Sequence, residues 1–298
     1  MRSEGLWLLS FFFLTCFGFV SAQSKSSHSY IKVADVKYAT HPNTDSKLNM
    51  LDVYMPKKGS NSPILIWIHG GALAYGDKEY VQEKAEFFTR KGYVFVSINY
   101  RLSPKVIHPA HVQDVAEAIV WVNKNARHYS ADASKIFIMG HSSGAHLAAL
   151  VCLDNNYLAT AGGSWSMIRG VVLLDGAGYD IPVLMADARS RQREWYIHAF
   201  GSTKKEWEQA SPAYVIKPGK GIPPFMIAYA GERDASEIEA KILSKKLSES
   251  NIENTVFFYQ KKTHLTISRE LGEDGDKPTE DVLRFLLERN YIAVNPTR

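Results

Sequence analysis

The sequence predicts an α/β fold in which helices cover both faces of a mostly parallel sheet. Short apolar runs of strand length alternate with amphipathic stretches of helix length along the 298-residue chain. Such alternation favours right-handed crossovers between parallel strands. The chain is 45% hydrophobic and has neither an internal repeat nor a Pro/Gly/Ser-rich linker, so one large domain is the simplest organisation.

The first 22 residues have the pattern of a secretory signal peptide. Arg2 precedes an apolar run over residues 6–20, and Ala22 supplies a small residue before a cut at Gln23. The run is short for a spanning helix, although an uncleaved anchor is the alternative. We therefore expect export from a bacterium, with the chain secreted or periplasmic and no stable membrane insertion after signal cleavage.

Charge and cysteine content argue against a nucleic-acid-binding protein and against a disulfide-bonded one. The net charge is +4 and the basic residues are scattered, which does not support nucleic-acid binding. Cys16 would leave with the signal peptide, so Cys152 would stand alone and form no internal disulfide. Cys152 falls in an apolar helical stretch and is interpreted as a small buried hydrophobe.

Eight stretches of the expected domain, residues 23–298, read as strands. The first two alternate in polarity around a turn and predict an antiparallel pair at one edge of the sheet. The later ones are mostly apolar, and residues 136–139 form an unbroken apolar run, which is typical of strands buried on both faces. The expected strands cover residues 31–38, 48–54, 64–68, 94–98, 136–139, 171–174, 224–229 and 255–259.

Helices are expected between these strands. Gly92 ends one helical pattern and Pro109 opens the next. The expected helices cover residues 78–91, 109–122, a stretch after residue 142, 236–250 and 278–290. Residues 180–221 show no sheet pattern and are rich in aromatic side chains. They predict a small cap insertion over the site, in which Trp195 and Trp207 are candidate substrate contacts.

The segment Gly140-His141-Ser142-Ser143-Gly144 joins a predicted strand directly to a predicted helix. It reads GxSxG, the pattern of a sharp turn that holds a serine hydroxyl clear of the sheet. Flanking glycines suit the close approach of backbone at such a turn. Ser142 is therefore the predicted nucleophile. Centring the motif on Ser143 would put His141 and Ala145 where glycines belong.

A serine nucleophile needs a base to take its proton. His264 follows the last predicted strand, so it lies at the carboxyl end of that strand, where ligands bind in such sheets. The chain order serine, acid, histidine of one hydrolase architecture also requires a late histidine. We predict His264 as the base. His146, on the helix after the serine, is expected to pack instead.

The acid that orients the histidine should follow another strand between the two. Asp234 follows the strand that ends near Tyr229 and is our first choice. Asp175 follows the preceding strand and is the second choice, and Glu232 competes by its closeness in sequence.

The segment His69-Gly70-Gly71-Ala72 follows an apolar strand and predicts an oxyanion hole. Two glycines let the backbone approach a substrate with its N–H groups turned inward. The expected donors are the amides of Gly71, Ala72 and Ser143. His69 is expected to brace this loop.

No Cys or His pair has metal-ligand spacing, so no metal is expected. Arg101 follows a strand and Asp114 lies on the next helix, which predicts a structural ion pair beside the loop.

Taken in order, these segments resemble α/β-hydrolases of the esterase/lipase group. The similar segments are His69-Gly70-Gly71, Asn99-Tyr100-Arg101-Leu102, Gly140-His141-Ser142-Ser143-Gly144, Gly231-Glu232-Arg233-Asp234 and Thr263-His264. The most similar branch holds feruloyl and acetyl-xylan esterases and kynurenine formamidases, near hormone-sensitive-lipase-like enzymes. The resemblance implies a triad of Ser142, Asp234 and His264 and no cofactor. Ala72 departs from the family pattern, in which a third glycine is common.

These observations predict a secreted serine carboxylesterase that acts on small-molecule or polysaccharide-linked esters, among them acetyl and feruloyl esters. The alternatives are an arylformamidase that uses the same triad and a non-catalytic binding protein on the same fold.

Overall fold

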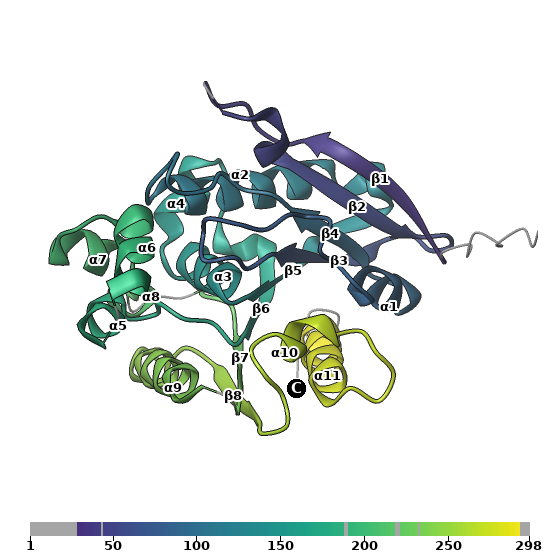
Figure 1. Cartoon of the computed structure of the whole chain (residues 1–298). Helices are drawn as coiled ribbons and strands as arrows, with labels where there is room; N and C mark the ends of the chain where they lie inside the picture. Colours follow the sequence, from purple (N-terminus) through teal and green to yellow (C-terminus); the bar gives the residue numbers. More distant parts are fainter. Residues whose placement is uncertain (1–28, 43, 188–189, 218–220, 232, 293–298) are drawn as a thin grey trace, which may run out of the picture.

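The computed structural model describes residues 29–42, 44–187, 190–217, 221–231 and 233–292. Its centre is a sheet of eight strands in the order β1-β2-β4-β3-β5-β6-β7-β8 (Figure 1). The strands are β1 (Tyr30–Lys37), β2 (Met50–Pro56), β3 (Ser62–Ile68), β4 (Val94–Ile98), β5 (Ala131–His141), β6 (Ile168–Leu174), β7 (Phe225–Ala230) and β8 (Asn254–Tyr259). The predicted signal peptide, residues 1–22, lies outside the described residues.

The strand directions follow the prediction. β1 pairs antiparallel with β2, and β2 pairs antiparallel with β4. The other neighbouring strands all run parallel. The mostly parallel sheet and its antiparallel edge, both predicted from the sequence, are therefore confirmed. The parallel strands end together at one edge of the sheet, so the loops after β3, β5, β6, β7 and β8 meet there.

Both faces of the sheet are buried. Successive side chains of a strand point to opposite faces, so each central strand contributes to two core clusters. In β3, Ile64 and Ile66 belong to one core cluster, whereas Leu65 and Trp67 belong to the other. All four side chains are at most 2% exposed. This two-sided burial explains why the central strands are unbroken apolar runs in the sequence.

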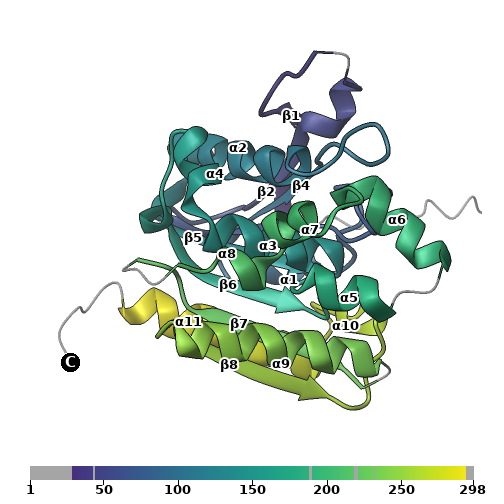
Figure 2. The same cartoon turned by 90° about the vertical axis from the view of Figure 1, so that its left-hand side faces the viewer.

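Helices cover the two faces in separate layers (Figures 1 and 2). One layer contains α2, α3 and α9, and the other contains α1 and α11. The helices outside the insertion are α1 (Lys84–Arg90), α2 (Ala110–Asn125), α3 (Ser143–Leu153), α4 (Asn155–Thr160), α9 (Asp234–Glu249), α10 (Thr266–Arg269) and α11 (Lys277–Ile292). Short 3-10 turns cover Ser46–Asn49, Ala126–Tyr129 and Trp165–Met167.

One predicted helix is shorter than expected. The sequence predicts a helix over residues 78–91, but α1 begins only at Lys84. Lys78 is instead turned into the protein, where its Nζ lies 2.7 Å from Asp52 and 2.8 Å from Asp35. This buried ion pair holds the segment before α1 in turns.

The cap insertion lies between β6 and β7 and is helical. It contains α5 (Ile181–Asp187), α6 (Ser190–Phe200), α7 (Lys204–Ala210) and α8 (Pro212–Val215). The Ile181 amide donates to Ser211 Oγ over 2.9 Å, and the Ala213 amide donates to Tyr179 O over 2.9 Å. These bonds tie the two ends of the insertion together, beside α3 and α9 (Figure 2). Within the described part of the chain, no helix has the length and apolar character needed to span a membrane.

Candidate active site

Ser142 occupies the tight turn between β5 and α3. Its backbone has φ 55° and ψ −123°, a strained conformation for a residue with a side chain. The flanking glycines are sterically required. A Cβ at Gly140 would lie 2.3 Å from Gly144 O, and a Cβ at Gly144 would lie 2.2 Å from Ile68 O. The turn therefore presents the Ser142 hydroxyl at the start of α3, where helix amides favour negative charge.

His264 reaches Ser142 from the loop after β8. Its Nε2 lies 3.0 Å from Ser142 Oγ, as the prediction of this pair required. The loop is held by His141, whose Nε2 donates to His264 O over 2.7 Å and whose ring lies 4.7 Å from the His264 ring. Burial lowers the pKa of His141 to about 3, so it stays neutral. Sequence reasoning did not identify this bracing role.

Among the described side chains, the carboxylate of Asp175, the second choice from the sequence, contacts His264 Nδ1 in the place that the prediction gave to Asp234. Asp175 Oδ2 lies 2.5 Å from His264 Nδ1, and its side chain is fully buried at the end of β6. Asp234 is the first residue of α9, and its side chain is outside the described part of the structure. Both acids follow a strand, so strand order left Asp175 as the second choice.

Neighbouring groups keep Asp175 charged. Burial by itself would raise the pKa of this carboxyl, but hydrogen bonds from His264 and from the Ala230 amide, 2.9 Å from Oδ1, lower the pKa below its usual value. An ionised Asp175 accepts from Nδ1–H of His264, which leaves the Nε2 lone pair facing the Ser142 hydroxyl.

The loop after β3 carries amides without acceptors beside Ser142. Among the described residues, the backbone N–H groups of Gly71 and Ala72 donate no hydrogen bond. Gly71 has φ +126°, and a Cβ there would lie 2.1 Å from Tyr75 O. Ala72 adopts φ 53°. The Leu73 amide donates to Ser143 Oγ over 3.3 Å, which fixes the loop against the start of α3.

His69 braces this loop, as expected. Its Nδ1 donates to Gly70 O over 2.8 Å, and its ring stacks on Tyr100 with centroids 4.4 Å apart. The Tyr100 hydroxyl donates to His69 O over 2.9 Å. Burial lowers the pKa of His69, so this side chain remains neutral and acts as support.

Two cavities meet at Ser142. The larger measures about 740 Å³ and is lined by Trp67, Tyr75, Tyr80, Leu265 and Arg269. The smaller measures about 260 Å³ and is lined by Leu73, His146, Tyr196, Phe200 and Arg233.

The cap contributes one of its two candidate tryptophans to this site. Trp195 lines both cavities beside Ser142. Trp207 lies within the cap instead, where its Nε1 donates to Gly201 O over 2.9 Å. His146 also follows expectation, because its Nδ1 donates to Gly178 O and its side chain is buried.

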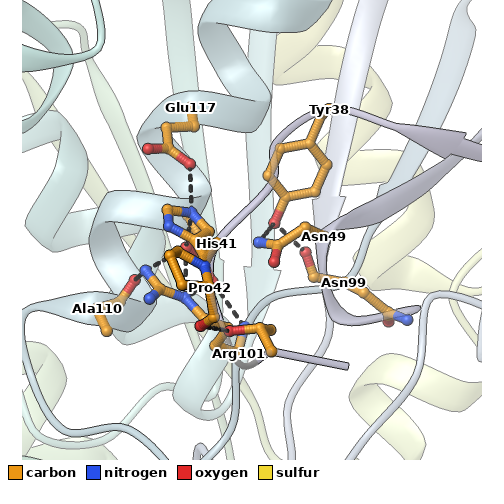
Figure 3. Close-up of polar contacts among 10 residues, drawn as sticks. Tyr38, His41, Pro42, Asn49, Asn99, Arg101, Ala110 and Glu117 are labelled. Carbon is orange, nitrogen blue, oxygen red and sulfur yellow. Dashed lines mark hydrogen bonds and ion pairs between the residues drawn. The ribbon is translucent and has the colours of Figure 1, made fainter. Parts of the chain in front are cut away.

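The predicted Arg101–Asp114 pair is present and holds the chain after β4 against α2. Arg101 Nε and Nη2 donate to Asp114 Oδ1 over 2.9 and 2.7 Å, and Nη2 also donates to Ala110 O. His41 Nε2 lies 2.9 Å from Glu117 Oε2 (Figure 3). The same nitrogen lies 3.3 Å from Asp114 Oδ1. His41, Asp114 and Glu117 are close enough to share a cation. The Arg101 guanidinium already neutralises Asp114, so we interpret the group as an ion-pair network.

The sequence of this chain matches a known protein family. The family model described as BD-FAE matches residues 51–247, more than half of the chain. The probable isoprenylcysteine alpha-carbonyl methylesterase ICMEL1 of Arabidopsis thaliana is 25% identical over 84% of this chain and 56% of its own length. Esterase LipC of Mycobacterium tuberculosis is 31% identical over 64% of this chain and 49% of its own length. The chain thus spans about half the length of these relatives.

Solved structures share the whole fold. Esterase B from Lactobacillus rhamnosis superposes with a TM-score of 0.74 at 20% identity, over 90% of this chain and 87% of that chain. A truncated carbohydrate esterase from gut microbiota gives a TM-score of 0.72 at 22% identity, over 89% of this chain and 99% of that chain. The α/β-hydrolase fold predicted from the sequence is therefore confirmed.

Proposed function

The chain belongs to the BD-FAE family, and on that premise we propose that it is a serine hydrolase that cleaves carboxylic esters through an acyl-enzyme on Ser142. One observation carries the proposal. The chain of contacts from Asp175 Oδ2 through both nitrogens of His264 to Ser142 Oγ is continuous, with distances of 2.5 and 3.0 Å. Esterase relatives by sequence and by fold support the same reaction class.

In the proposed mechanism His264 takes the Ser142 proton as Oγ attacks the ester carbonyl. Asp175 holds the imidazole in the tautomer that can accept this proton and stabilises the imidazolium that forms. The carbonyl oxygen becomes negative beside the amides of Gly71, Ala72 and Ser143. Each such donor lowers the barrier by about 2.7–4 kcal/mol. His264 then protonates the leaving alcohol, and water releases the acid by the same steps.

The larger cavity suits a bulky alcohol such as a sugar residue. Its rim carries three exposed aromatic side chains, Tyr75 at 65%, Tyr80 at 60% and Trp195 at 39% exposure. Flat rings at an open rim provide contact area for a sugar or phenolic ring. We therefore extend the proposal to acetyl and feruloyl esters linked to polysaccharides, which also agrees with the structural likeness to a carbohydrate esterase.

Export is part of the same proposal. The signal pattern in residues 1–22 supports secretion or periplasmic delivery, where polysaccharide esters are met. Mass spectrometry of the exported protein tests it, because cleavage would leave Gln23 as the first residue. Recovery of the uncut chain in the membrane fraction would favour an anchor instead.

Replacing the nucleophile tests the reaction. Ser142→Ala should lower kcat by on the order of a million-fold, because the remaining groups cannot form the acyl-enzyme. A fluorophosphonate should label the wild-type protein and leave the variant unmodified. Ser143→Ala keeps Ser142 and the residue 143 amide and loses only the hydroxyl that accepts from the Leu73 amide, so as the matched control it should still be labelled, although more slowly.

Substrate comparison decides between the reaction classes. The proposal expects faster turnover of 4-nitrophenyl acetate and of acetyl or feruloyl sugars than of N-formylkynurenine. A preference for the formamide would make the protein an arylformamidase. Wild-type protein that neither turns over an ester nor reacts with fluorophosphonate would be a binding protein on this fold.

A further inference from the structure

Arg233 is a cation at the active site, and no described residue gives its guanidinium an anionic partner. It is partly buried directly before α9, and its Nη1 lies 2.9 Å from His264 Nδ1. Within the described part of the chain, no carboxylate oxygen lies within 4.0 Å of this guanidinium, and Nδ1 is its one hydrogen-bonding contact.

The contact with His264 cannot satisfy Arg233. Nδ1 must carry a proton to donate to Asp175, so in the working tautomer it offers no lone pair to a second donor. A guanidinium is protonated at all ordinary pH values and has N–H donors only. The N–H groups of Arg233 that face the site are thus left for another acceptor.

The positive charge of Arg233 lies at the wall of the smaller cavity. Arg233 is the one permanently charged side chain among the described residues that line it. His146 also lines it, but burial lowers the pKa of that histidine to about 3, so it is neutral. Tyr196 and Phe200 supply an aromatic wall. A cation that faces a partly enclosed, largely apolar space attracts an anion more strongly than one in open water.

We propose that Arg233 binds a carboxylate of the substrate, so that the enzyme prefers esters carrying a carboxylate a few bonds from the scissile carbonyl. This inference rests on the proposed esterase function and adds a preference set by the smaller cavity to the one that the larger cavity sets for a sugar or phenolic group. The fork of N–H donors on a guanidinium matches the two oxygens of a carboxylate. Binding would also neutralise a positive charge next to the imidazole that becomes positive during the reaction.

The position of Arg233 sets the length of the substrate. The His264 imidazole is the group between the guanidinium and Ser142 Oγ, because Nη1 contacts one ring nitrogen and Oγ contacts the other. A carboxylate that reaches Arg233 while the carbonyl lies at Oγ must span that ring, which takes about two to four carbon atoms. Half-esters of short dicarboxylic acids fit this length.

Matched esters test the inference on the acyl side. Mono-4-nitrophenyl glutarate and 4-nitrophenyl pentanoate have acyl chains of equal length and differ by a carboxylate in place of a methyl group. After subtraction of the rate without enzyme, wild-type kcat/KM should favour the glutarate at least tenfold, mainly through a lower KM. Arg233→Gln should reduce this ratio at least tenfold, and Arg233→Lys should restore part of it.

A second pair tests the alcohol side, with 4-acetoxybutanoate compared with butyl acetate by titration of the released acid. A carboxylate preference in either pair that is lost in Arg233→Gln supports the inference. Arg269→Gln removes the same charge from the larger cavity and is the matched control, which should keep the wild-type ratios. Thermal unfolding of each variant verifies that it is folded.

The outcomes separate this inference from the proposed function. Equal ratios in wild type and Arg233→Gln for both pairs, with the neutral esters still hydrolysed, would overturn the carboxylate site alone. Loss of the preference in Arg269→Gln instead would assign anion binding to the other cavity and also overturn it. Failure of the wild-type enzyme on every neutral ester would overturn the esterase assignment.

Discussion

At the scale of single residues, the orientation of His264 depends on which acid reaches it. Asp175 ends β6 and is held by the Ala230 amide of the neighbouring strand, so its carboxylate has one fixed direction. Its backbone adopts φ 44°, which turns the side chain away from the strand path. Strand order alone does not reveal this turn, because β6 and β7 end beside each other at the same edge.

Exchanging the two candidate acids for amides tests this assignment. Asp175→Asn should lower kcat by about 10⁴-fold, because an amide no longer holds His264 in the working tautomer. Asp234→Asn is the matched control and should stay near the wild-type rate. The measurement is kcat on 4-nitrophenyl acetate, and the opposite ranking would return Asp234 to the role predicted from the sequence.

At the scale of elements, the loop after β3 depends on a backbone conformation that leaves no room for a side chain at Gly71. Gly71 combines a positive φ with close approach to Tyr75 O. Its amide and that of Ala72 can then face the substrate, while Ser143 Oγ and His69 hold the loop in place. Alanine occupies the third position at φ 53°, in the small left-handed region that a residue with a side chain can still adopt.

Two glycine-to-alanine variants distinguish the effect of backbone strain from the effect of the close approach to Tyr75 O. Gly92→Ala meets nothing within 4 Å but forces alanine to φ +88°, so it should cost about 1–3 kcal/mol of stability and leave kcat unchanged. Gly71→Ala carries similar strain and a clash at 2.1 Å as well, so it should lose both stability and at least tenfold in kcat. Denaturant unfolding and ester kinetics measure the two effects. Equal kcat in both variants would remove Gly71 from the oxyanion hole.

At the scale of the whole molecule, Glu239 connects α9 to the chain between the site and the cap. Its buried carboxyl accepts from the amides of Tyr179 and Asp180, at 2.7 and 3.2 Å. This segment leads from Asp175 into α5, so one side chain joins the catalytic strand end, the cap and α9. Burial raises the pKa of Glu239 from 4.5 to about 7, with Asp180 adding to the rise.

The raised pKa predicts a pH-dependent stability. Between pH 4.5 and about 7 the folded protein holds a proton on Glu239 that the unfolded chain releases, so stability from this group falls as pH rises. The loss should approach about 3 kcal/mol. Glu239→Gln should remove this slope, measured as the unfolding free energy at pH 5 and pH 8. Glu237→Gln, on the outer side of the same helix, should retain it. A slope unchanged by Glu239→Gln would contradict the assignment.

Local patterns predicted the strands and most of the helices because burial on both faces of a parallel sheet requires continuous apolar runs. The serine turn could also be predicted from local sequence, since the structure has no space for a Cβ at Gly140 or Gly144 and glycine is therefore required there. The start of α1 could not be predicted in this way, because the buried Lys78 forms ion pairs with Asp35 and Asp52, which are distant in sequence. Local sequence also could not show that Trp195 lines the site and Trp207 does not, because this depends on how the cap helices pack.

The sequence by itself determined the order of the strands and helices, the serine turn and the late histidine, because each of these depends on neighbours along the chain. Only the tertiary structure decided that Asp175 contacts His264, that His141 braces it and that the guanidinium of Arg233 lies beside it. These contacts join residues that lie far apart in the sequence. Their distances are set by strand register and loop direction, which no local pattern encodes.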